Sequence, residues 1–200
     1  AALDAKLKEN VQLELITLQK EIGVTFVYVT HDQGEALALS HRIAVMNHGR
    51  VEQLDEPSKI YGFPRNRFVA DFIGQCNLLD GRIESCAGER MTVSLDGIGQ
   101  VAALNVERDE PGLQGVLALR PEKVAIGRDL SAHADLNRFP GKVLDFLYLG
   151  DVTVYIVELA GGKRIEALLP NSAAGRTKFF EAGDEVQVGW HFDAGHFLND

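Results

Sequence analysis

Cysteine is scarce in this 200-residue chain, which has only Cys76 and Cys86. Two cysteines in a chain of this length do not make a disulfide framework, so we expect reduced structural thiols. Basic residues are also in deficit, since 20 lysines and arginines face 29 aspartates and glutamates, for a net charge of −9. This deficit argues against a general nucleic-acid binder, because phosphates are bound by basic surfaces.

Long apolar runs are missing too. No stretch approaches the roughly 20 apolar residues that a membrane-spanning helix needs, and the first residues show no apolar core of a signal peptide. These absences predict an acidic, cytoplasmic type of protein that reaches a membrane only through partners. The hydrophobic content of 46% is ordinary for a globular protein.

Residues 1–74 alternate between helical and strand-like patterns. Apolar residues recur every three or four positions from Leu7 to Ile22, which predicts an amphipathic helix that Gly23 ends. A β-branched and aromatic run over 24–30 predicts a buried strand. The further elements expected here are a helix to about Ser40, strands at 42–47 and 51–54, and short helices at 57–62 and 67–73.

Residues 75–200 instead show short strand patterns separated by turn signals such as Asp96-Gly97 and Gly161-Gly162. Strands this short and frequent are typical of a small barrel or sandwich. This part holds 12 basic and 19 acidic groups, a net of −7, whereas residues 1–74 hold 8 and 10, a net of −2. The ten expected strands lie near 79–85, 90–95, 98–104, 114–119, 123–127, 140–149, 152–159, 164–169, 185–191 and 195–199.

The tripeptide Thr30-His31-Asp32 ends the strand expected at 24–30. A titratable side chain at the carboxyl end of a buried strand lies where open α/β sheets bind their ligands. Asp32 and Glu35 predict an acidic capping box, in which Asp32 accepts a helix N–H and Glu35 reaches back to the cap. Taken alone, a histidine at this position is more often a hydrogen-bonded structural residue.

A phosphate-binding loop of the form G-x-x-x-x-G-K-[ST] is absent. Gly141-Lys142 and Gly162-Lys163 lack both the upstream glycine and the following serine or threonine. No apolar strand ends in adjacent aspartate and glutamate, the usual source of a metal-binding carboxylate and a catalytic base. The scattered His191 and His196 have no partners at zinc-ligand spacing, so we expect no metal site.

Several segments in combination resemble the ATPases of ATP-binding-cassette (ABC) transporters. The segment around Asp4 resembles their D-loop, Thr30-His31-Asp32-Gln33 their switch, and 66–74 the connection to an accessory domain. Leu119-Arg120-Pro121-Glu122-Lys123 and Leu147-Tyr148-Leu149-Gly150-Asp151 are similar to that accessory domain, an OB-fold-type module called TOBE. This pairing is found in importers of polyamines, ferric iron and sugars, and the two accessory-domain segments favour spermidine/putrescine importers.

The resemblance implies an α/β remnant of a nucleotide-binding domain at 1–74, followed by an all-β, OB-fold-like TOBE domain at 75–200. It implies that His31 is the catalytic switch residue that contacts the γ-phosphate of ATP. Asp4 would contact the opposite subunit of the nucleotide-bound dimer. Because the front half of such a domain is missing, we expect a C-terminal fragment that is inactive alone and holds no cofactor.

For the full-length protein, the resemblance implies ATP and Mg²⁺ as cofactors and a homodimer with a second ATPase subunit. Its other partners would be membrane permease subunits and, indirectly, a substrate-binding protein, at the cytoplasmic face of the bacterial inner membrane. One alternative is non-enzymatic: residues 75–200 act as a regulatory, dimerisation or ligand-sensing module. A nucleic-acid-binding OB protein is the weaker third hypothesis, which the acidic charge disfavours.

Overall fold

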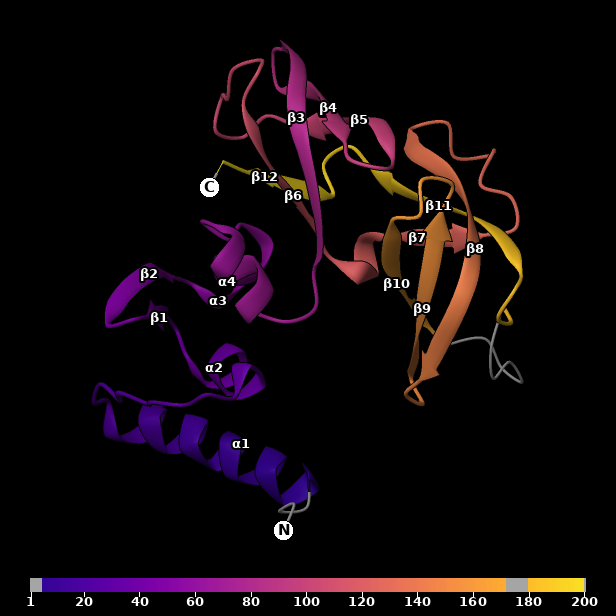
Figure 1. The fold of residues 1–200 in the computed structure, drawn as a ribbon. Coiled ribbons are helices and arrows are strands. Elements are labelled where there is room, and N and C mark those ends of the chain that lie inside the picture. Colours follow the sequence, from indigo (N-terminus) through magenta and orange to yellow (C-terminus); the bar gives the residue numbers. More distant parts are fainter. Residues whose placement is uncertain (1–4, 172–179, 200) are drawn as a thin grey trace. The chain divides into compact units, whose positions relative to one another are not determined.

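A computed structural model of the chain describes residues 5–171 and 180–199 (Figure 1). The described residues form two compact units whose chain segments interleave. The first unit takes the residues up to Arg65 together with Phe72–Gly74, and the second takes Asn66–Asp71 and the residues from Gln75 onward. Each unit is described here by itself.

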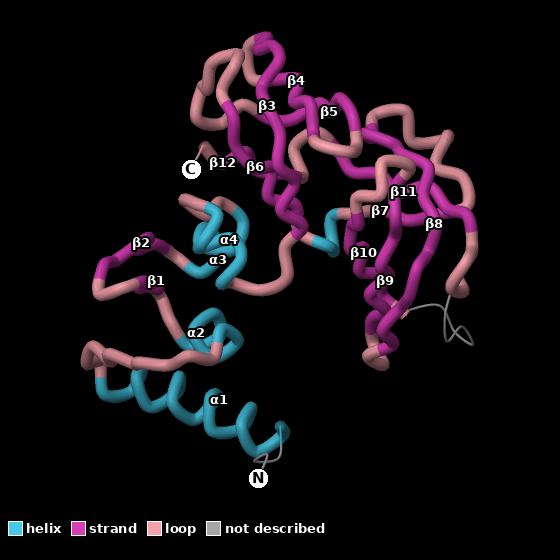
Figure 2. Tube along the Cα trace, in the orientation of Figure 1, coloured by secondary structure: helices cyan, strands magenta, loops and turns pink. Residues whose placement is uncertain are grey.

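The first unit consists of helices and one β-hairpin (Figure 2). Gly23 ends the first helix as expected, with φ of +69° and its N–H donated to the carbonyl of Gln19 at 3.0 Å. The hairpin turns through His48 and Gly49, whose φ values of +46° and +76° suit a tight two-residue connection. The elements are α1 (Ala5–Ile22), α2 (Gln33–Leu39), β1 (Ile43–Asn47), β2 (Arg50–Asp55) and α3 (Pro57–Gly62).

The prediction of a strand at 24–30 is wrong. The segment is extended in the structure, but within the described residues no other strand pairs with it. Val27 and Val29 are 89% and 92% exposed, so the apolar run that predicted burial lies in solvent. A strand is defined by the ladder of hydrogen bonds to its neighbours, and residue composition supplies none of those neighbours.

The second unit contains all ten expected strands, and the bounds of β4, β6, β9 and β11 match the prediction residue for residue. Helix α4 (Arg67–Phe72) precedes them, and Asn66 caps it as expected by accepting the N–H of Val69 at 3.0 Å. The other elements are β3 (Asn77–Ala87), β4 (Arg90–Leu95), β5 (Gly99–Leu104), β6 (Gln114–Leu119), the 3₁₀ helix η1 (Pro121–Lys123), β7 (Ala125–Gly127), β8 (Leu136–Tyr148), β9 (Val152–Leu159), β10 (Arg164–Pro170), β11 (Glu185–His191) and β12 (Gly195–Leu198).

These strands form two five-stranded antiparallel sheets, ordered β12-β6-β3-β4-β5 and β10-β9-β8-β11-β7. The two edge strands of each sheet also approach each other, β5 with β12 and β7 with β10, so each sheet curls toward a barrel. One continuous apolar core takes residues from both sheets, with Trp190 and Tyr155 as its largest fully buried members. The architecture is therefore the all-β, barrel-like one that the strand pattern predicts.

Two asparagines join the sheets by imitating a strand pairing. Asn77 on β3 donates to the carbonyl of Glu166 and accepts its N–H, at 2.9 and 2.7 Å. Asn137 on β8 does the same with Ala102 on β5, at 2.9 and 2.8 Å. A side-chain amide matches the peptide group in donors and acceptors, so both asparagines satisfy backbone groups of the opposite sheet.

Two hairpin turns, one from each sheet, also touch. A Cβ placed on Gly161, between β9 and β10, would lie 2.0 Å from the carbonyl oxygen of Gly97, between β4 and β5. Real Cβ atoms do not approach a backbone oxygen this closely, so the contact requires glycine at position 161.

Candidate functional site

His31 lies between the extended segment 24–30 and helix α2, with an exposed side chain. Within the described residues its ring makes no hydrogen bond and no ion pair. The backbone on both sides is held in place. The Oγ1 of Thr30 accepts the N–H of Asp32 at 2.9 Å, and Asp32 accepts the N–H of Glu35 at 3.0 Å.

Of the predicted capping box, the Asp32 cap is confirmed and the return contact from Glu35 is not. Asp32 is the N-cap of α2, as predicted. Glu35 does not reach back to the cap N–H; its Oε2 instead accepts the hydroxyls of Thr30 at 2.7 Å and Tyr28 at 2.9 Å. The N–H of Asp32 already donates to the Oγ1 of Thr30, so the Glu35 carboxylate accepts the two hydroxyls instead. The result is a hydrogen-bond network that holds the backbone on both sides of His31.

Asp4, the other residue singled out by the sequence, lies outside the described residues.

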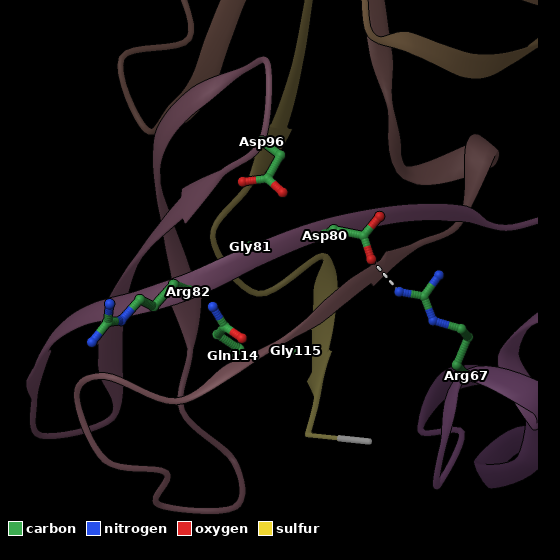
Figure 3. A pocket seen from close by; sticks show the side chains of 7 residues that line it. All are labelled: Arg67, Asp80, Gly81, Arg82, Asp96, Gln114 and Gly115. Atoms are coloured by element: carbon green, nitrogen blue, oxygen red, sulfur yellow. Dashed lines mark hydrogen bonds and ion pairs between the residues drawn. The ribbon is translucent and has the colours of Figure 1, made fainter.

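A hollow of about 360 Å³ on the second unit was not anticipated from the sequence (Figure 3). Asp80 points toward Arg67 and forms an ion pair with it, whereas Arg82 points away from both. The Nζ of Lys163 also lies 3.9 Å from Oδ2 of Asp80, so two cationic side chains balance the negative charge of this carboxylate. The hollow is lined by residues of α4, β3, β6 and the turn between β4 and β5, so no local motif indicates it. These residues are Arg67, Asp80, Gly81, Arg82, Asp96, Gln114 and Gly115.

No cluster of three or more histidine, cysteine, aspartate or glutamate side chains suited to a metal ion occurs among the described residues. His191 instead pairs with two carboxylates, Asp193 at 2.6 Å and Asp135 at 3.4 Å. Cys76 and Cys86 are free, and burial raises the pKa of the Cys76 thiol above 9.0, although Arg120 opposes the shift. A protonated buried thiol is a structural group and a poor nucleophile.

His196 on β12 gives the second unit a pH dependence. Burial lowers the pKa of His196 below 6.5, although Glu107 and Asp109 oppose the shift. On acidification the unfolded chain therefore binds a proton at His196 before the folded chain does. The contribution of this residue to stability is complete above pH 6.5 and is lost as the pH falls through that value.

We expect His196→Gln to flatten the fall in the free energy of unfolding between about pH 7.5 and about pH 5. Urea unfolding of both proteins at each pH measures it. Burial raises the pKa of Asp109 above its usual value, which acts with the opposite sign at lower pH. The comparison is therefore made at about pH 5 and above. Equal pH slopes for the two proteins would contradict the expectation.

No helix among the described residues is long and apolar enough to cross a membrane.

Comparison with known proteins gives a family match for the second unit. Residues 117–198 match the family described as TOBE domain. Among solved structures, the cytoplasmic molybdate-binding protein ModG superposes with a TM-score of 0.54 at 16% identity, covering 62% of this chain and 96% of ModG. This likeness concerns the fold alone, and with the TOBE match it confirms the OB-fold-like class expected for this part of the chain.

Sequence similarity over the whole chain is much higher to another group of proteins. The chain is 62% identical over 198 residues to the spermidine/putrescine import ATP-binding protein PotA of Pseudomonas aeruginosa strain UCBPP-PA14, covering 99% of this chain and 54% of that protein. It is 59% identical over 200 residues to the PotA of Chromobacterium violaceum, covering 100% and 55%. The chain therefore spans about half the length of these relatives and matches their C-terminal half. The resemblance to importer ATP-binding subunits is confirmed along the entire chain.

Proposed function

We propose that this chain is the C-terminal part of the ATP-hydrolysing subunit of an ABC importer for polyamines. The observation that carries the proposal is identity of about 60% along the entire chain to spermidine/putrescine import ATP-binding proteins. In the full-length protein, ATP with Mg²⁺ would be hydrolysed to energise uptake through a membrane permease. Residues 1–74 would complete the nucleotide-binding domain, and 75–200 would form the accessory TOBE domain.

His31 would act as the switch residue of that enzyme. Its exposed ring, without a partner among the described residues, is available to donate a hydrogen bond to a γ-phosphate oxygen. The Thr30–Asp32–Glu35 network fixes the backbone that carries it, and phosphoryl transfer depends mainly on such positioning and on charge stabilisation. In this role His31 acts as a hydrogen-bond donor and does not need to act as a base.

The exposed segment 24–30 supports the same proposal. Val27 and Val29 have the composition of a buried parallel strand but lie in solvent. In the full-length subunit, the half that this chain does not contain would supply the neighbouring strands and cover them. Asp4 would lie at the interface with the second ATPase subunit of a homodimer, on the cytoplasmic side of the membrane.

The proposal is tested by comparing two proteins. The full-length subunit, assembled with its permease in proteoliposomes, should hydrolyse ATP faster when spermidine-loaded binding protein is present. The 200-residue chain alone should show no turnover above buffer, because the phosphate loop and catalytic carboxylates are absent from it. Turnover proportional to the concentration of the short chain, and surviving His31→Ala, would refute the proposal. Stimulation by a sugar or ferric-iron binding protein in place of the polyamine one would reassign the substrate.

The second candidate is a ligand-sensing module, supported by the fold of residues 75–200. ModG, a molybdate-binding protein, shares that fold. If the 200-residue chain dimerises and binds a small ligand while the full-length subunit lacks nucleotide hydrolysis, this function replaces the first.

A further inference from the structure

The hydroxyl of Thr30 makes two hydrogen bonds of opposite sense. Its Oγ1 accepts the N–H of Asp32 at 2.9 Å and donates its own proton to Oε2 of Glu35 at 2.7 Å. The first of these bonds joins the residues on either side of His31, so it closes a small ring of atoms that contains the backbone of His31. The φ and ψ angles that aim the imidazole are therefore restricted by the Thr30 hydroxyl.

Glu35 holds that hydroxyl in place. Its Oε2 also accepts the hydroxyl of Tyr28 at 2.9 Å, and its backbone N–H donates to Oδ1 of Asp32 at 3.0 Å. Hydrogen bonds to a carboxylate are shorter and stronger than those between neutral groups. The rotamer of Thr30 that closes the ring is thus fixed from the first turn of α2.

The imidazole of His31 takes no part in this network. It is exposed, and within the described residues it makes no hydrogen bond or ion pair. A side chain without such bonds is aimed mainly by the backbone that carries it. All the residues concerned belong to the first compact unit, so the network is described within one rigid part of the chain.

We propose that Thr30 and Glu35 are positioning residues for His31. The Thr30 hydroxyl closes the backbone around His31, and the Glu35 carboxylate keeps that hydroxyl in the closing rotamer. Neither residue needs to touch the nucleotide, because both act through the direction of the imidazole, and small errors in such a direction lower the rate of a catalysed step. The assignment rests on the proposed function, in which His31 contacts the γ-phosphate.

Thr30→Val in the full-length subunit tests the assignment, because valine has the shape of threonine and lacks the hydroxyl. We expect kcat for ATP hydrolysis with the permease to fall roughly tenfold, as for the loss of one hydrogen bond, with KM for ATP unchanged. Thr30→Ser keeps the hydroxyl and should restore most of the activity. Thr17→Val is the matched control, since the Thr17 hydroxyl donates to the carbonyl of Leu13 within α1 at 3.0 Å; it should leave kcat unchanged.

A double-mutant cycle separates positioning from a merely structural role. If Thr30 acts through His31, then Thr30→Val should cause no further loss of kcat in a His31→Ala background. The same roughly tenfold loss in both backgrounds would overturn the proposal, because the hydroxyl would then act independently of the histidine. Glu35→Met, which removes the acceptor, should behave like Thr30→Val and covers the case in which that variant does not fold.

Amide hydrogen exchange of the nucleotide-free, full-length subunit gives a readout that does not depend on activity. The amide of Asp32 should exchange roughly tenfold faster in Thr30→Val and at the parent rate in Thr30→Ser and Thr17→Val. Parent-like exchange at Asp32 in Thr30→Val would overturn the proposal. If His31→Ala keeps the parent kcat, the proposed function fails at this residue, and the exchange at Asp32 still decides whether the hydroxyl holds the backbone.

Discussion

Replacing His31 with alanine in the full-length subunit should lower kcat for ATP hydrolysis by roughly two to three orders of magnitude. This is the usual effect of removing one hydrogen-bond donor from a developing anionic charge. The KM for ATP should change little, because most of the binding energy comes from the phosphate loop and base contacts elsewhere in such a domain. Steady-state kinetics of the variant with its permease measures both quantities.

His41→Ala is the matched control for this substitution. His41 is also an exposed histidine of the first unit, ten residues farther along the chain and beyond the end of α2. It should leave kcat unchanged. Because the exposed His31 ring makes no hydrogen bond or ion pair within the described residues, His31→Ala should also leave the unfolding midpoint unchanged, which separates a lost catalytic group from a lost fold. A His31→Ala protein that retains more than half of the parent activity would remove His31 from the mechanism.

The largest effect on stability is expected from Gly161→Ala. The new methyl group would fall 2.0 Å from the carbonyl oxygen of Gly97, so the two turns must separate. Overpacking of this kind costs up to about 3 kcal/mol in the free energy of unfolding. Urea unfolding followed by the fluorescence of Trp190, which is buried in the core shared by both sheets, reports on the affected unit.

Gly162→Ala separates the clash from the loss of glycine. A methyl group at position 162 meets nothing within 4 Å, but φ there is +76°, so the substitution should cost only about 1 kcal/mol of backbone strain. A Gly161→Ala protein that is as stable as Gly162→Ala would show that the hairpin turns move apart freely. The contact between them would then contribute little to the fold.

The β-rich unit was largely predictable because its signals are local. Alternating apolar residues and glycine turns determined strands such as 90–95 and 152–159 to the residue, and the turns at Gly97 and Gly161 were both identified. Their mutual contact was not, because it depends on the way two sheets meet and leaves no periodic pattern. The same applies to Asn77 and Asn137, whose partners lie 89 and 35 residues away.

The functional region was predictable only in part. Capping rules identified the role of Asp32, since it follows from a few adjacent residues. Motif similarity singles out His31, whose catalytic role stays a prediction. The strand at 24–30 failed because pairing partners are a property of the whole sheet. Gln33 and Arg120 both lie in motifs that the sequence shows, but those motifs do not indicate their hydrogen bonds, because the bonded backbone groups of Gly74 and Gln75 are 41 and 45 residues away.

The interleaving of the two units around residues 66–74 matters to anyone who expresses the β-rich part separately. A gene segment that starts at Gln75 omits Ala70, which packs in an apolar cluster with Val116 and Leu198 and whose carbonyl accepts a hydrogen bond from the buried Arg120. The encoded protein would begin with an uncovered apolar patch and an arginine short of an acceptor, both of which favour aggregation. A segment that starts ahead of Asn66 retains the cap of α4 and the covering helix, and is the better choice for crystallisation or binding assays.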